Sequence, residues 1–207
     1  MTANEKIIKD LRLSKERFLH TMGVADCAKK LARRHFPSLS AEKTETAALL
    51  HDFTKEYSLN EQIALCRKYN IALTDEEKKT PKLYHAKTAA AIAKHQYGVD
   101  EETASAIYYH TTGRANMTVA EVCLYFADYI EEYRTEESCV KVREYYESLL
   151  FKEQSHLTAL YKAVVYSFNM TILHLLEISE SINTETVNAR NWYINILKEG
   201  KETNGGQ

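Results

Sequence analysis

A histidine followed directly by an aspartate, His51-Asp52, stands at the end of the Ala- and Leu-rich stretch 44–50. His20 precedes this pair and Asp128 follows it, each in a different segment of helical pattern. Imidazoles and carboxylates are the donors that borderline and hard metal ions take up in proteins. A buried aspartate is costly unless it has a cation or a hydrogen-bond partner. The four residues therefore predict a metal site, and a metal site in a helical core suggests hydrolysis.

The elements that position these residues are predicted to be helices throughout. The chain has only 6 glycines and 2 prolines, and its apolar residues follow the helical period. Ser14 is a suitable N-cap for a helix that ends near Phe36, and Ser40 for one that runs into His51-Asp52. Further helices are expected over residues 59–69, 81–94, 100–110, 138–150, 153–178 and 183–198. The fold class is therefore all-α.

Two of the candidate ligands lie on helix faces that are predicted to point inward. His20, Val24 and Leu31 form one apolar stripe at helical spacing. Taken by itself, His20 could instead be a core histidine that is hydrogen-bonded to a carbonyl and binds no metal. Asp128 follows a capping box at residues 118–121 and lies one turn after Leu124, with no cationic residue three or four positions away. Taken jointly, the inward positions favour a shared metal ion.

Composition excludes several classes of function. The net charge is −2 and the pI is near 6.5, so no basic field attracts nucleic acid or a membrane surface. The N-terminus lacks an apolar signal segment, and the most apolar stretch, 159–178, is interrupted by charged residues. The four scattered cysteines fit reduced thiols. We expect a cytoplasmic protein with one domain over residues 1–198 and a disordered tail over 199–207.

The arrangement of His20, His51-Asp52 and Asp128 resembles the HD-domain superfamily of metal-dependent phosphohydrolases. The flanking segments resemble the bacterial branch that cleaves diadenosine tetraphosphate symmetrically into two ADP, from about Ser14 to Leu197. These segments are RFLHTMGV at 17–24, AALLHDFTK at 47–55, YHAKTA at 84–89, YYHTTG at 108–113, YFADYIEEYR at 125–134 and TVNARNW at 186–192. The resemblance implies a single all-α domain of the HD type.

The resemblance also implies roles for particular residues. The metal ion, iron (Fe2+ or Fe3+) with Mn2+ or Co2+ as alternatives, is held by His20, His51, Asp52 and Asp128. Asp52 orients the attacking water, and Asp52, His85 and His110 form the catalytic set. The phosphate chain of the dinucleotide substrate is bound by Arg17, Lys55, Thr111 and Arg134 together with His20, His85, His110 and Asp128.

Several alternatives stay open at this point. His85 and His110 are assigned to phosphate contact or leaving-group protonation, but they also stand where a second metal ion would find ligands. The substrate alternatives are a nucleoside monophosphate, an alarmone or a cyclic dinucleotide, and a non-catalytic nucleotide-sensing module is the alternative to an enzyme. A homodimer is possible. His174 is predicted to lie in the core, and the tyrosine pairs at 108–109 and 145–146 to pack structurally rather than to stack on adenine.

Overall fold

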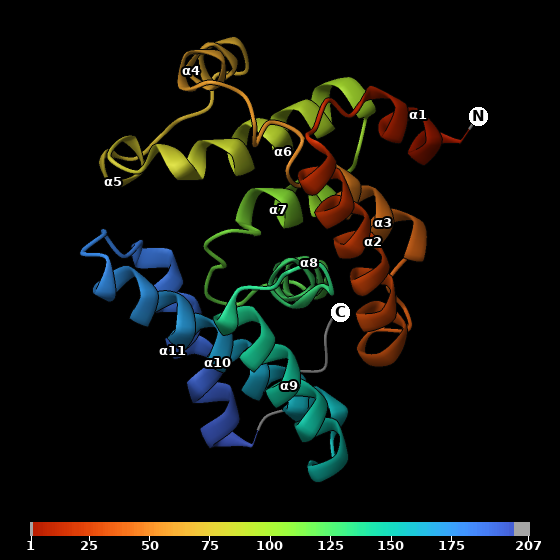
Figure 1. Ribbon diagram of the computed structural model, residues 1–207, viewed down its shortest axis with the longest axis vertical. Helices are drawn as coiled ribbons and strands as arrows, with labels where there is room; N and C mark the ends of the chain where they lie inside the picture. Colours follow the sequence, from red (N-terminus) through yellow and green to blue (C-terminus); the bar gives the residue numbers. More distant parts are fainter. Residues whose placement is uncertain (1, 201–207) are drawn as a thin grey trace.

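The computed structural model describes residues 2–200, which contain helices and no strand. Figure 1 shows their arrangement, and the all-α prediction is confirmed. The elements in chain order are α1 (Ala3–Asp10), α2 (Lys15–His35), α3 (Ala41–Leu50), α4 (Leu59–Lys68), α5 (Asp75–Lys78), a 3-10 turn (Pro81–Leu83), α6 (Tyr84–Tyr97), α7 (Glu101–Tyr109), α8 (Val119–Ile130), α9 (Glu137–Lys152), α10 (His156–Glu177) and α11 (Thr184–Glu199).

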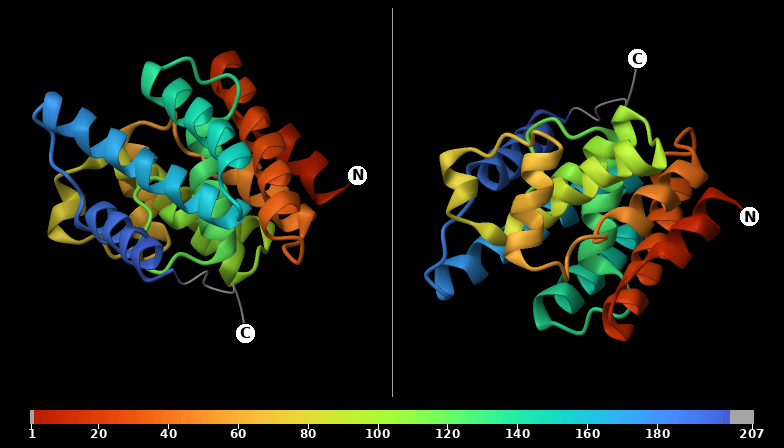
Figure 2. Two further views of the ribbon diagram at one scale, coloured as in Figure 1. Left: turned by 90° about the horizontal axis from the view of Figure 1, so that it is seen from below. Right: turned by 90° about the horizontal axis from the view of Figure 1, so that it is seen from above.

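Helix α8 occupies the centre of the bundle and is seen nearly end-on in Figure 1. It packs on α2, α3 and α7 on one side and on α9 and α10 on the other. Phe126 of α8 and Phe168 of α10 are fully buried in this core. Helices α4, α5 and α6 lie at one end of the molecule and α9, α10 and α11 at the other (Figures 1 and 2). The central helix therefore carries Asp128 into the middle of the fold.

The starts of the site-bearing helices are set by the predicted caps. The side chains of Ser14 and Ser40 accept hydrogen bonds from backbone N–H groups in the first turns of α2 and α3. Thr118 and Glu121 form the complete capping box of α8. These bonds satisfy N–H groups that a helix start leaves without partners. Capping therefore fixes the register that places His20, His51 and Asp128.

The structure differs from the prediction in one added helix and at several helix boundaries. Helix α1 was not predicted; its Thr2 capping box and the buried Ile7 stabilise it against α3. The helix expected from residue 81 begins as a 3-10 turn and becomes α-helical at residue 84. Helix α10 begins only after its N-cap Ser155. Helix α11 continues through Glu199, and residues 201–207 of the predicted disordered tail lie outside the described residues.

Helix α10 is the one described helix that is long and apolar enough to cross a membrane, by length and composition alone. Its best window has a mean hydropathy of 1.2, and 39% of that window is buried within the protein. The helix packs on α9 and α11 and also contacts α2 and α8. A core helix of a bundle has the same apolar composition.

Candidate metal centre

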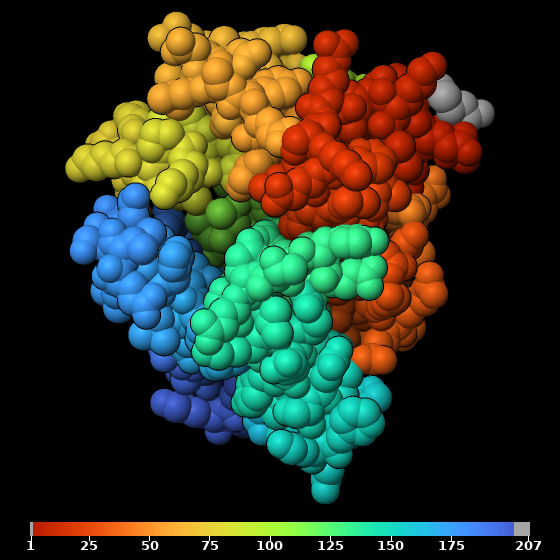
Figure 3. All heavy atoms as spheres, viewed as in Figure 1, coloured from red at the N-terminus to blue at the C-terminus, as the bar shows by residue number. Residues whose placement is uncertain are grey.

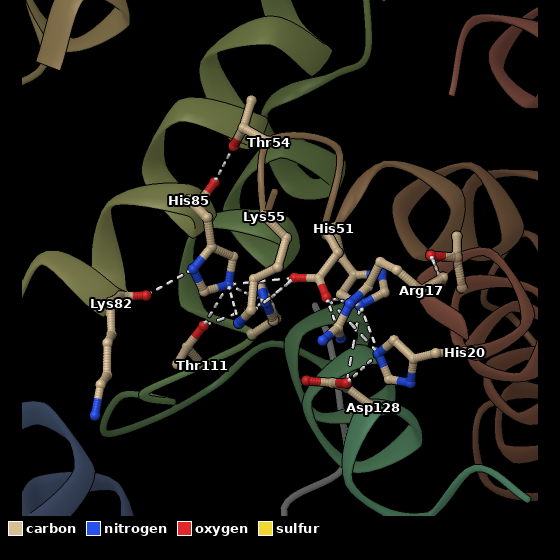
Figure 4. Close-up of polar contacts among 12 residues, drawn as sticks. Arg17, His20, His51, Thr54, Lys55, Lys82, His85, Thr111 and Asp128 are labelled. Carbon is tan, nitrogen blue, oxygen red and sulfur yellow. Dashed lines mark hydrogen bonds and ion pairs between the residues drawn. The ribbon is translucent and has the colours of Figure 1, made fainter. Parts of the chain in front are cut away.

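Four imidazoles and two carboxylates from five segments of the chain meet in the interior of the bundle (Figure 4). His20 comes from the middle of α2, and Asp128 from the last turn of α8. The other four stand at helix ends: His51 and Asp52 directly after α3, His85 in the first turn of α6 and His110 directly after α7. The four predicted metal ligands are therefore brought together, and the two further histidines join them.

Three helices direct their C-terminal ends toward this cluster, namely α3, α7 and α8. The C-terminal end of a helix carries a partial negative charge from its unpaired carbonyl groups, and this charge stabilises a nearby cation. The field of the backbone thus adds to that of the two aspartates. The local electrostatics favour a bound metal ion.

The polar atoms form two groups that share Asp52. In the first group, His20 Nε2 lies 3.1 Å from Asp128 Oδ1 and 3.4 Å from His51 Nε2. His51 Nε2 lies 3.6 Å from Asp52 Oδ2. In the second group, the other oxygen of Asp52, Oδ1, lies 3.3 Å from His85 Nε2 and 3.6 Å from His110 Nε2. His20, His51 and Asp52 have the spacing of a set of metal ligands, and so do Asp52, His85 and His110. A third such set, His51, His110 and Asp128, links the two groups.

Three of the rings are oriented in the same way by their own backbone. The Nδ1 atoms of His51, His85 and His110 each donate to the carbonyl three residues earlier, at 2.6, 2.7 and 2.7 Å respectively. With the ring proton on Nδ1, the lone pair of each Nε2 faces the cluster. Burial lowers the pKa of His51 to about 3 and that of His85 to about 4, so both rings are neutral at pH 7.

The inward lone pairs of these rings indicate a bound cation. The Nε2 atoms of neutral rings face carboxylate oxygens that also carry lone pairs, and no proton lies between them. Asp52 Oδ1 is buried without a hydrogen-bond partner among the described residues. A cation resolves this repulsion, and the nitrogen and oxygen donors suit a divalent ion such as iron, manganese or cobalt. The residues present therefore fit a metal ion.

His20 differs from the other three histidines. Its Nδ1 lies 3.0 Å from Oε1 of Glu131, a residue at the end of α8. Burial alone would lower the pKa of His20, but the hydrogen bonds to Asp128 and Glu131 outweigh it and raise the pKa to about 9. Glu131 was not among the predicted site residues. Its position three residues after Asp128, on the same helix face, was the available signal.

Comparison with known proteins agrees with this geometry. Residues 17–133 match the HD domain, which covers more than half of the chain. The chain belongs to the HD-domain phosphohydrolases. It is 33% identical to the symmetrical bis(5'-nucleosyl)-tetraphosphatase of Staphylococcus aureus (strain NCTC 8325 / PS 47), over 88% of this chain and 89% of that protein. It is also 33% identical to the protein of the same name from Bacillus subtilis (strain 168), over 88% of this chain and 92% of that protein.

A solved structure shares the whole HD-domain fold. It is a predicted HD superfamily hydrolase involved in NAD metabolism from Clostridium acetobutylicum, 32% identical in sequence. The two structures superimpose with a TM-score of 0.81, over 94% of this chain and 98% of that chain. The single HD-domain bundle is therefore confirmed, with the cluster inside it.

The predicted cationic residues surround the HD-domain cluster. Arg17 donates to Asp52 Oδ2 at 2.8 Å, and Arg134 donates to Asp128 Oδ1 at 2.8 Å. Lys55 Nζ lies 3.2 Å from His85 Nε2. Burial would raise the pKa of the Asp128 carboxyl, but the Arg134 guanidinium and His20 hold it well below its ordinary value. Two of the predicted cations therefore lie beside the carboxylates of the cluster.

Thr111 completes this wall of the site. Its hydroxyl lies 3.2 Å from His110 Nε2 and 3.4 Å from His85 Nε2. The loop that carries it is held from α11, because the Thr186 hydroxyl donates to the carbonyl of Thr112. Every site residue predicted from the sequence thus lies at or beside the cluster, while the role of each stays a prediction.

A cavity of about 630 Å³ opens beside the cluster. Lys55, Thr111, Asp128 and Arg134 line its inner end. The remaining wall comes from the start of α9 and the C-terminal half of α10, and the face in Figure 3 is hollowed between these segments. This cavity therefore connects the cluster with solvent.

The cavity corrects the prediction for His174, which is exposed and lines the wall formed by α10. Helix α10 extends beyond its neighbours at this end, so a residue in an apolar stretch there stays accessible. The predicted tyrosine pairs contact other side chains of the fold, although Tyr145 is also exposed beside Tyr166. Tyr108 stacks edge-on against Tyr109 and contacts Lys87, and Tyr146 packs on Phe126.

Proposed function

We propose that this protein hydrolyses diadenosine tetraphosphate symmetrically, giving two molecules of ADP. The observation that carries the proposal is the cluster of inward lone pairs at the inner end of a cavity, with the cations Lys55 and Arg134 beside it. The similarity to two relatives named as symmetrical tetraphosphatases, over nearly the full length of each, supports the choice of substrate.

His20, His51, Asp52 and Asp128 would hold the ion. A bound metal ion would lower the pKa of a water molecule and polarise the phosphoryl group under attack. Asp52 has an oxygen, Oδ1, that lacks a hydrogen-bond partner and faces His85 and His110. This oxygen would orient the water and accept its proton.

Symmetrical cleavage breaks the central P–O bond of the tetraphosphate. The water oxygen attacks one of the two inner phosphorus atoms, and the bridging oxygen leaves with the other ADP. Arg17 and Arg134 would bind non-bridging phosphate oxygens. Lys55 would stabilise the negative charge that develops during the step. His110 and His85, held by their backbone carbonyls with Nε2 toward the site, would bind a phosphate oxygen or pass a proton to the leaving group.

The cavity is large enough for one nucleoside with part of its phosphate chain, by the usual range for small-molecule sites. Tyr129 and Met170 line it and offer an aromatic and an apolar surface to a base. Iron is the proposed native metal, with Mn2+ and Co2+ as alternatives. We also propose that the protein acts in the cytoplasm.

The test is hydrolysis by the purified protein reconstituted with Fe2+ without oxygen, or with Mn2+. Diadenosine tetraphosphate should yield ADP as the only nucleotide, and a single turnover in H2(18)O should place one labelled oxygen in every two ADP. AMP together with ATP would mean asymmetric cleavage and would contradict the proposal. A panel with a nucleoside monophosphate, an alarmone, a cyclic dinucleotide and NAD identifies any other preferred substrate. Binding of these nucleotides without turnover by the metal-loaded protein would instead indicate a sensing module.

A further inference from the structure

A buried carboxylate behind the metal centre is not used by the proposed mechanism. The side chain of Glu131 is fully buried, and both of its oxygens have partners. Oε1 lies 3.0 Å from His20 Nδ1, and Oε2 accepts the backbone N–H of Tyr133 at 2.7 Å. Because both partners present N–H groups, the carboxylate acts as an acceptor only.

His20 needs such a partner because of its place in α2. His51 and His110 follow helix C-terminal ends, where carbonyls are free to accept a ring proton, and His85 donates to the carbonyl of Lys82 in the 3-10 turn that precedes α6. His20 stands inside a helix of 21 residues, where the carbonyls of the preceding turn accept backbone N–H groups instead. A distant side chain must therefore orient this ring, and Glu131 is 111 positions away in the chain.

Gly23 provides the space for this contact. It lies on α2 one turn after His20 and is buried within the helix. A Cβ at this position would lie 2.2 Å from Glu131 Oε2 and 2.7 Å from Cδ2 of Tyr133. Glycine is the least favourable residue after proline inside a helix, and its φ here needs no special freedom. The absence of a side chain at position 23 is thus explained by the carboxylate beside it.

Arg143 of α9 fixes the segment that carries this carboxylate. Its Nε donates to the carbonyl of Ile130 at 2.7 Å, and its NH2 donates to the carbonyls of Glu131 and Arg134. The same guanidinium therefore holds both the residue behind His20 and Arg134, which contacts Asp128. The position of Glu131 is determined from outside the metal centre.

We propose that Glu131 is the positioning residue of the metal centre, and that Gly23 is a glycine so that this carboxylate can reach His20. Glu131 holds the ring proton on Nδ1 and turns the lone pair of Nε2 toward the metal ion. Partners of this kind commonly change metal affinity by about 10–100-fold when they are removed. The inference rests on the metal centre of the proposed function and not on its substrate.

The experiment measures metal affinity without substrate, by titration of the metal-free protein with Mn2+ in competition with a chelator. Glu131→Ala and Gly23→Ala should each weaken binding by about 10–100-fold. Glu131→Gln, which keeps the size of the side chain, should weaken it by about 5-fold or more, because its amide presents a donor to one of two N–H groups. The matched control is Glu132→Gln, since Glu132 is the exposed neighbour, and its affinity should equal that of the parent.

A nitrogen-detected NMR spectrum of the histidine rings gives the readout that a general loss of packing would not produce. His20 should be protonated at Nδ1 in the metal-loaded parent, and this signal should shift or disappear in Glu131→Gln. If Glu131→Ala does not fold, the metal affinity and the His20 signal of Glu131→Gln test the inference instead. Parent-like affinity with an unchanged His20 signal in Glu131→Gln would overturn the inference. The parent protein could fail to cleave diadenosine tetraphosphate while the variants still show the expected changes in metal affinity. That result would overturn only the proposed substrate.

Discussion

The histidines of the metal centre fall into two classes by what orients their rings. His51, His85 and His110 donate to carbonyls three residues earlier in their own segment. The ring of His20 is instead oriented by Glu131, which lies 111 positions later in the chain. The first class is oriented as soon as its helix end forms. The second is oriented only when α2 and α8 have packed, so three of the four rings are oriented locally and one depends on tertiary packing.

Asp52 joins the two classes, and its removal should have the largest effect. One of its oxygens faces His20 and His51, and the other faces His85 and His110. Asp52→Ala should reduce turnover by more than about 10³-fold and remove most bound metal, because it deletes the proposed ligand and proton acceptor. The measurements are steady-state kinetics, metal analysis and circular dichroism. The dichroism spectrum of the variant should remain that of a helical protein. Asp26→Ala, at an exposed aspartate of α2, is the control, and near-parent turnover in Asp52→Ala would refute the mechanism.

His110→Ala tests the locally oriented class. The ring lies 3.2 Å from His85 Nε2 and on the Oδ1 side of Asp52, away from His20. We expect one metal ion per chain to remain and kcat/KM to fall by about 10²-fold, which is the usual value of a positioned proton donor. Metal analysis and anomalous scattering count the ions. A loss of one of two ions would instead assign His85, His110 and Asp52 to a second metal site.

Arg134→Gln tests a contact that belongs to the tertiary class. Arg134 lies six residues after Asp128, and Arg143 of α9 donates hydrogen bonds to carbonyls of the turn between them. A hydrogen bond to a charged group contributes about 1.5–3 kcal/mol, so kcat/KM should fall by about 10–100-fold. The loss should come mainly through KM, since the phosphate chain is bound in the ground state as well. Arg33→Gln, at an exposed position of α2, should change neither constant, and an equal fall in both variants would indicate a nonspecific effect of charge.

The same division explains how much could be predicted from the sequence. Capping residues and helical spacing placed His51, Asp52 and Asp128 correctly, because these signals act within one or two turns. Motif resemblance added Arg17, Lys55 and Arg134, whose side chains converge on the cluster. Glu131 and the space at Gly23 were missed because they depend on how α8 crosses α2. The cavity along α10 and the exposure of His174 were missed for the same reason, since both follow from how far one helix extends beyond its neighbours.

His35, at the end of α2, is a third case and should show the smallest effect. Its Nε2 pairs with the Tyr146 hydroxyl at 2.6 Å, while its Nδ1 is buried with neither a carbonyl nor a carboxylate as partner. Burial, together with the charges of Arg34 and His156, lowers the pKa of His35 to about 4 from 6.5. Between pH 6.5 and pH 4 the unfolded chain therefore binds a proton that the folded chain does not, and stability falls as the pH falls. His35→Gln removes this titration, so its Tm should decline less than that of the parent over this interval, by about 2–4 °C. Calorimetry of the metal-free proteins at pH 7, 5.5 and 4.5 measures the difference, and parallel declines would show that this ring titrates alike in both states.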